Sequence, residues 1–140
     1  MGIIVPTGKS GIFGNLKQHG RARAALPILV LRAQEPNTIT FRELGNAIGF
    51  RRYDLFGGIL DCINTELHNI NADIPTLSTI VVRINNDGKM EPSGWMANQM
   101  QEQLNIEPTW ENYHRICIQP VFDYPDWDKV MDEIIQSPNW

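Results

Sequence analysis

The sequence has no long apolar segment. Its longest apolar stretch, Ala24 to Leu31, is interrupted by Pro27, whereas a membrane-spanning helix needs about 20 apolar residues in succession. Positively charged residues do not precede the apolar ones near the N-terminus, so the pattern of a secretory signal is missing. We therefore expect a protein of the cytoplasm with no membrane partner.

Cysteine and histidine are scarce, which limits the chemistry open to the chain. Cys62 and Cys117 both lie in apolar patterns, and this predicts buried free thiols. His19, His68 and His114 are isolated, without partners at the spacing that metal and nucleophile sites use. We therefore expect no metal, no cofactor and no catalytic residue. An enzyme of unrecognised type ranks third among our hypotheses.

A phosphate-binding loop is also missing. Gly8-Lys9-Ser10 resembles the end of such a loop. The motif needs a glycine five residues before Gly8 and a buried strand before that. Position 3 is isoleucine instead, so we expect no bound nucleotide.

Charge is divided unequally along the chain. Residues 1–52 contain eight lysines and arginines against two acids, whereas residues 53–140 contain four against fourteen. Such asymmetry is typical of a basic surface for nucleic acid with acidic flanks. It is equally typical of two halves that neutralise each other across their interface, and both interpretations stay open.

The most strongly patterned part of the chain runs from Ile39 to Trp95. It opens with a helix-start signal, Thr40 followed three residues later by Glu43, and Gly49 ends this predicted helix. A second helix is predicted from about residue 54 to about residue 70. Its apolar residues recur every three or four positions: Leu55, Ile59, Ile63, Leu67 and Ile70.

A β-hairpin is predicted directly after these helices. Residues 78–84 are rich in β-branched side chains, which favours a strand. Asn85-Asn86-Asp87-Gly88 predicts a tight turn, because Asp-Gly accepts positive φ angles. Residues 89–95 are expected to form the return strand, weakened by Pro92. Two helices followed by a hairpin is the winged-helix arrangement.

The flanking segments complete the predicted fold, which is of the α+β class. Residues 1–20 are expected to form an N-terminal arm. Residues 21–96 form a winged-helix-like core of three helices plus a β-hairpin wing, with the first helix ending at Gln34. Residues 97–140 form a C-terminal extension packed on the core: a helix over 97–105, a strand over 115–119 and a last helix near Trp127.

The central helices carry a specific resemblance. Thr40 to Gly49, followed by Leu55-Phe56-Gly57-Gly58-Ile59-Leu60, resembles the DNA-binding domain of O6-alkylguanine-DNA alkyltransferases and their non-catalytic, alkyltransferase-like relatives. The similarity covers residues 38–95, and Asp87-Gly88 falls in the wing. The resemblance implies a winged-helix domain that binds double-stranded DNA.

The sequence departs from that family at its functional positions. The family's Pro-Cys-His-Arg motif is absent, and Thr76 or Ile80 stands at the cysteine position, depending on the alignment. Asp54 replaces the family's arginine. Alkyl transfer is therefore excluded. The segment after the second helix also resembles uncharacterised bacterial proteins of mobile-element or phage-defence neighbourhoods. The residues that carry this resemblance are Pro75, Leu77 and Ile80-Val81-Val82, followed by Pro92 and Gly94-Trp95.

We therefore predict a non-catalytic protein that binds double-stranded DNA or another nucleic acid. Gly57-Gly58 would permit close approach by another helix or by a phosphate. The outward side of the second helix is expected to show Asp54, Asp61, Asn64, Thr65 and His68. The candidate nucleic-acid-binding residues are Arg42, Arg51, Arg52, Arg83 and Lys89.

The alternative is a protein-interaction module, such as an immunity or anti-defence protein. It would bind a basic protein partner through its acidic C-terminal half. The candidate partner-binding residues lie on the predicted solvent-facing side of the last helix: Asp126, Asp128, Asp132 and Glu133. The tryptophans, with Tyr113 and Tyr124, are assigned to the core and to element ends, with a stacking pocket as the other possibility.

Overall fold

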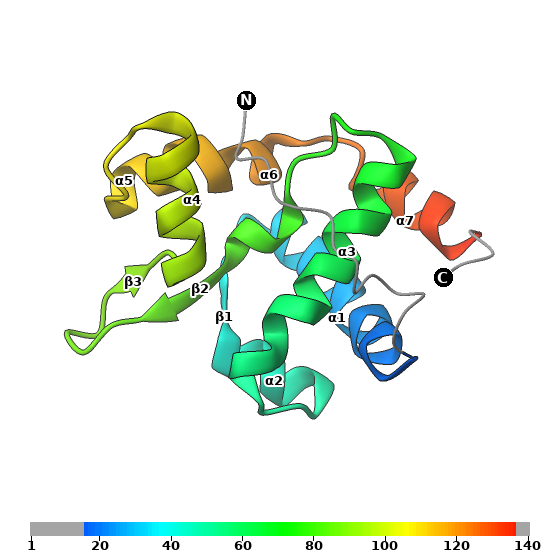
Figure 1. The fold of residues 1–140 in the computed structure, drawn as a ribbon. Coiled ribbons are helices and arrows are strands. Elements are labelled where there is room, and N and C mark those ends of the chain that lie inside the picture. Colours follow the sequence, from blue (N-terminus) through cyan, green and yellow to red (C-terminus); the bar gives the residue numbers. More distant parts are fainter. Residues whose placement is uncertain (1–15, 137–140) are drawn as a thin grey trace.

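The computed structural model describes residues 16–136, which fold into an α+β arrangement that is mostly helical (Figure 1). The N-terminal half contains α1 (Leu16–Gln34), β1 (Ile39–Thr40), α2 (Phe41–Ile48), the 3₁₀ turn η2 (Tyr53–Leu55) and α3 (Phe56–Ile70). Then follow the 3₁₀ turn η3 (Leu77–Ile80), β2 (Val81–Ile84), β3 (Met90–Glu91) and α4 (Gly94–Leu104). The chain continues with α5 (Trp110–Tyr113), the π-helical turn η4 (His114–Ile118), α6 (Gln119–Asp123) and α7 (Trp127–Ile135).

Helix α1 is the central element of the core. It contacts α2, α3, η3, α6 and α7, and its fully buried side chains include Leu26 and Leu29. The predicted arm of residues 1–20 is wrong for residues 16–20, which belong to this helix. Leu16, Lys17 and Gln18 have high helix propensity, so the helix tolerates the single Gly20, whose propensity is low. Residues 1–15 lie outside the described part of the chain.

Helix α2 has the predicted ends. Thr40 is its N-cap: Thr40 Oγ1 accepts a hydrogen bond from the Glu43 amide at 3.0 Å, and Glu43 Oε1 accepts one from the Thr40 amide at 3.1 Å. This reciprocal pair satisfies two amides that the helix leaves without partners. The hydrogen bond from the Thr40 backbone also lowers the pKa of Glu43. Gly49 ends the helix with a φ of +70°, which suits glycine because it has no Cβ.

The predicted turn of the hairpin is confirmed, but its strands are shorter than expected. Gly88 has a φ of +77°, and Asn85 Oδ1 accepts hydrogen bonds from the amides of Asp87 and Lys89. Strand β2 pairs antiparallel with β3, with Ile84 opposite Met90. Residues 78–80 belong to η3 instead. The return strand ends at Glu91, because Pro92 has no amide to donate and Ser93 caps α4 through the Met96 amide at 3.2 Å.

A third strand extends the hairpin into a sheet with the order β1-β2-β3. Strand β1 pairs parallel with β2, with Ile39 opposite Val81. Parallel neighbours need a crossover of a dozen or more residues, and α2 with α3 provides it. The succession of α1, α2, α3 and a hairpin agrees with the predicted order of elements. The parallel pairing was not predicted, because strand β1 contains two residues, too few for a strand pattern.

The predicted strand over 115–119 is wrong, because these residues are helical. Thr109 caps α5 by accepting the Asn112 amide at 3.2 Å, and the chain then continues through η4 into α6. Cys117 and Ile118 are adjacent and both buried, a pattern that a half-buried strand does not allow. The Cys117 carbonyl in this wide turn accepts the Thr79 hydroxyl at 3.0 Å, and the Tyr113 hydroxyl donates to the Thr79 carbonyl at 2.7 Å.

The last helix forms where the sequence predicts it, near Trp127. Trp127, Val130 and Ile134 of α7 are buried, and α7 contacts both α1 and α3. In the part of the chain that the structure describes, no helix combines the length and the apolar character that a membrane span requires.

Candidate nucleic-acid interface

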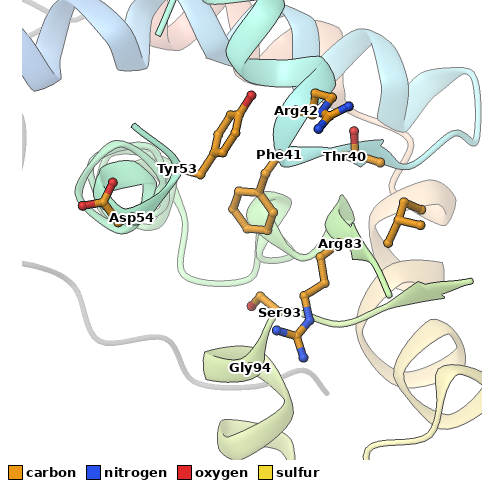
Figure 2. A pocket seen from close by; sticks show the side chains of 9 residues that line it. Thr40, Phe41, Arg42, Tyr53, Asp54, Arg83, Ser93 and Gly94 are labelled. Atoms are coloured by element: carbon orange, nitrogen blue, oxygen red, sulfur yellow. The ribbon is translucent and has the colours of Figure 1, made fainter. Parts of the chain in front are cut away.

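A pocket of about 780 Å³ opens where the start of α2, the turn η2, strand β2 and the start of α4 meet (Figure 2). Two of its residues, Arg42 and Arg83, come from opposite sides. Its complete lining is Thr40, Phe41, Arg42, Tyr53, Asp54, Arg83, Ile84, Ser93 and Gly94. The pocket therefore joins the segment between the two central helices to the hairpin.

An aromatic cluster supports one wall of this pocket. The ring of Phe56, which is buried, lies 5.9 Å from that of Phe41, 5.6 Å from that of Phe50 and 5.7 Å from that of Tyr53. The Tyr53 ring meets Phe56 edge-on at 82°, a favourable arrangement for aromatic pairs. The cluster therefore gives Phe41 and Tyr53 defined positions beside the pocket.

Gly45 permits this cluster to form, a role that the sequence analysis missed. A Cβ atom at position 45 would lie 2.6 Å from the Phe50 carbonyl oxygen and 2.8 Å from the Tyr53 ring. The first of these neighbours is backbone, which cannot move aside cheaply. A glycine in the middle of a helix costs about 1 kcal/mol relative to alanine. Close packing of the segment between α2 and α3 onto α2 explains its presence here.

The five predicted cations fall into two groups. Arg42, Arg51 and Lys89 are exposed, and among the described residues they have no ion-pair partner. Arg52 is paired with Asp54 at 3.0 Å, and Arg83 Nε is paired with Glu91 at 2.6 Å.

The carboxylate of Asp54 lies in the pocket lining and stays ionised at neutral pH. Its hydrogen bonds from Arg52, at 3.2 and 3.0 Å, lower its pKa. Asp54 thus neutralises Arg52 locally, and Arg52 contributes less positive potential than its position suggests. Of the predicted cations, Arg42 and Arg83 are the two that line the pocket itself.

Helix α3 presents only part of the outward side that the sequence predicts: Asp54, just before the helix, is exposed, whereas Asp61, Thr65 and His68 are half-buried. Asn64 is only 2% exposed, and its Nδ2 donates to Ser78 Oγ of η3 at 3.0 Å. Glu66 is 5% exposed. Within α3, Gly57 and Asn69 are the exposed residues. The expectation for Asn64 is therefore wrong, because η3 covers a side of the helix that would otherwise face water.

Gly57 has open space around it. A Cβ there would meet nothing within 4 Å, so packing against another helix does not require this glycine. It lies in the first turn of α3, close in the chain to Tyr53 and Asp54. The other explanation, close approach by a ligand, stays available at this position.

Both cysteines lie in surroundings that disfavour the thiolate form. Burial raises the pKa of the Cys62 and Cys117 thiols to about 11, so the reactive thiolate form is disfavoured. His114 lies between the rings of Trp110 and Phe122 at 6.0 and 5.9 Å. Within residues 16–136, no three His, Cys, Asp or Glu side chains are grouped as a metal site would require.

The acidic side of α7 is exposed, as the alternative function requires. Asp126, Asp128, Asp132 and Glu133 all face solvent, and the Asp128 carboxylate accepts a hydrogen bond from Gln34 at 2.8 Å. Beside them Ile135 is 63% exposed. These residues are not among those that line the pocket.

Comparison of the chain with protein-family models, with curated protein sequences and with solved structures finds no match.

Proposed function

We propose that this chain is a non-catalytic nucleic-acid-binding protein, and that its winged-helix-like part, α1 to α3 with the β2–β3 hairpin, carries the interface. The observation that supports this most strongly is the placement of Arg42, Arg51 and Lys89. They lie on α2, on the segment between α2 and α3, and on the hairpin, all exposed and without an ion-pair partner among the described residues. These are the segments that meet around the pocket.

Cations of this kind suit phosphates. A lysine or arginine without an acidic partner can bind a phosphate without first breaking an ion pair, and it releases a condensed counterion from the nucleic acid. Arg52 is bound to Asp54 through two nitrogens, so a phosphate must compete for it, whereas Arg83 is bound to Glu91 through Nε and its charge is partly neutralised. Arg42 and Arg51 are therefore the residues expected to contribute most to binding.

The first prediction tests these contacts by their salt dependence. Each phosphate contact contributes about −0.9 to the slope of log affinity against log salt for duplex DNA, and about −0.7 for single strands. The double variant Arg42→Ala/Arg51→Ala should flatten that slope by up to about 1.8 for duplex or about 1.4 for single strands. Fluorescence anisotropy with labelled oligonucleotides, between about 50 and 200 mM salt, measures it.

The matched control is Arg115→Ala/Lys129→Ala, which removes the same charge from exposed positions on η4 and α7. It should leave the slope close to that of the native protein. An equal change in both double variants would show that only net charge matters. Absence of binding to any oligonucleotide at about 50 mM salt would refute the proposed function.

A second candidate function is supported by the acidic side of α7. Exposed carboxylates around an exposed isoleucine suit a basic protein partner, because complementary charge speeds association while the apolar side chain is buried. The observation that favours it is Ile135 beside Asp132 and Glu133.

The second prediction separates these two functions. The variant Asp126→Lys/Asp132→Lys/Glu133→Lys should bind nucleic acid as well as the native protein or better, because repulsion of phosphate is reduced. Under the partner hypothesis, the native protein co-purifies with a basic chain that the variant loses. The absorbance ratio of the purified material reports bound nucleic acid, and its intact mass reports a co-purifying protein chain. Weaker nucleic-acid binding by the variant would contradict the assignment of the interface to the segments around the pocket.

A further inference from the structure

We propose that the pocket and its rim bind single-stranded nucleic acid, with unpaired bases stacked on Tyr53 and Trp95 and phosphates held by Arg42 and Arg83. This inference rests on the proposed function and narrows its ligand from nucleic acid in general to unpaired strands.

The rim of the pocket is unusually apolar for an exposed surface. Among the described residues, seven large hydrophobic side chains are exposed. Two of them, Tyr53 and Ile84, line the pocket, and three more are next to lining residues in the chain or across the hairpin. Each of the five is between 40 and 47% exposed. They are Tyr53 and Leu55 at η2, Ile84 and Met90 as a cross-strand pair of the hairpin, and Trp95 at the start of α4.

These side chains match unpaired bases better than a duplex. A duplex buries the faces of its bases in the stack and presents phosphates and base edges. An unpaired strand exposes the base faces, which stack on aromatic side chains, while arginines track the backbone. Tyr53 lines the pocket together with Arg42 and Arg83, and the exposed Trp95 directly follows the lining residues Ser93 and Gly94 in the chain. An aromatic ring with arginines in one pocket is the combination that single strands require.

Helix α3 supports the same conclusion. Reading a duplex through its major groove needs a helix with an exposed side rich in polar side chains. On α3, Gly57 and Asn69 are exposed, and Asn64 and Glu66 are buried. Its remaining polar side chains are half-buried: Asp61, Thr65 and His68. The second central helix is therefore poorly equipped for base-edge readout.

The pocket is also concave, and its cations reach it from both sides. A volume of about 780 Å³ lies in the range of about 300–1,000 Å³ that is typical of ligand pockets. Figure 2 shows the Phe41 ring between Tyr53 and Arg83. Arg83 uses Nε for Glu91, and its two terminal amino groups remain as donors for a phosphate.

The third prediction compares strands directly. Labelled 12-nucleotide DNA and RNA single strands and the 12-base-pair DNA duplex of the same sequence are titrated with the full chain by fluorescence anisotropy at about 100 mM salt. At least one single strand should bind about tenfold more tightly than the duplex. Trp95→Leu and Tyr53→Leu should each weaken that binding about tenfold, in line with the loss of one base stack. Comparison of the DNA and RNA strands identifies the preferred sugar.

Two controls keep the result specific to aromatic stacking. Trp95→Phe retains a ring and should restore most of the affinity, whereas Leu31→Ala changes an exposed apolar residue of α1 away from the pocket lining and should have no effect. Tyr53 also contacts Phe56. If Tyr53→Leu fails to fold, the Trp95 variants decide the matter.

Three outcomes would overturn the inference. The first is a duplex that binds as tightly as the single strands or more tightly. The second is an unchanged affinity of Trp95→Leu and Tyr53→Leu for the single strand. In both cases the proposed function survives if the salt slope still depends on Arg42 and Arg51. If no oligonucleotide binds and a co-purifying protein is lost in Trp95→Leu, both proposals fail and the rim is a protein-docking surface.

Discussion

Replacing Trp127 with alanine is expected to lower the free energy of unfolding by about 3–5 kcal/mol. Trp127 is 1% exposed, its ring lies 4.9 Å from that of Tyr124, and its Nε1 donates a hydrogen bond to the Val121 carbonyl at 2.9 Å. The alanine variant loses the largest side chain of the α7 interface and leaves the Val121 carbonyl without its donor. Denaturant unfolding monitored by circular dichroism measures the loss.

Trp127→Phe separates the lost hydrogen bond from the lost ring, and Ile135→Ala is an exposed control on the same helix. Trp127→Phe keeps a ring in the core but cannot donate the hydrogen bond, and an unsatisfied buried acceptor costs about 1–3 kcal/mol. Ile135→Ala lies on the same helix but changes a side chain that is 63% exposed, so its effect should stay within about 0.5 kcal/mol. A similar loss in Trp127→Ala and Ile135→Ala would mean that α7 is not packed on the core.

Leu67→Ala is expected to cost about 2–5 kcal/mol. Leu67 is fully buried in α3, a helix that packs against α1, η3 and α7. Each kcal/mol shifts the melting temperature by roughly 2–4 °C in domains slightly larger than this one. The variant should therefore melt roughly 4–20 °C below the native protein.

The matched control for this prediction is Leu31→Ala. Leu31 belongs to the apolar stretch of the first helix, yet it is 54% exposed. Its truncation should change the melting temperature by a small fraction of the Leu67 effect. Equal shifts in both variants would show that the helical phase assigned to α3 is wrong.

Local signals in the sequence predicted local structure well. The capping box of α2, its end at Gly49 and the turn at Asp87-Gly88 are all observed. Each depends on residues no more than about ten positions apart, so the information is contained in one short segment. The periodic apolar residues of α3 and α7 were likewise sufficient to predict helices, because they repeat over several turns.

Short patterns were less informative. The five residues 115–119 alternate as a strand would, yet they continue a helix from α5 to α6 through a π-helical turn. A pattern of this length is compatible with either state, and the hydrogen bond from Thr79 to the Cys117 carbonyl of this segment comes from 38 positions away in the chain. The return strand was predicted too long because the capping role of Ser93 outweighed the hairpin pattern.

The candidate interface was predicted only in part. Residue type identified the cations, and the pairing of Arg52 with Asp54 involves close neighbours in the chain. The register of β2 against β3 decides that Arg83 faces Glu91, and this register is set by the turn. The pocket between η2 and the start of α4 joins residues 40 positions apart, and no pattern in the sequence indicates it.

The sequence by itself determined the α+β class, the ends of α2, the hairpin turn and the types of residue available for binding. Caps, turns and helical periodicity act between neighbours, so their free energies depend little on the rest of the molecule. Only the tertiary structure decided that Asn64 is covered by η3, that β1 pairs with β2, and that Tyr53, Arg42 and Arg83 surround one pocket. These features arise where distant segments exclude water from each other, and the position of each segment depends on all the others.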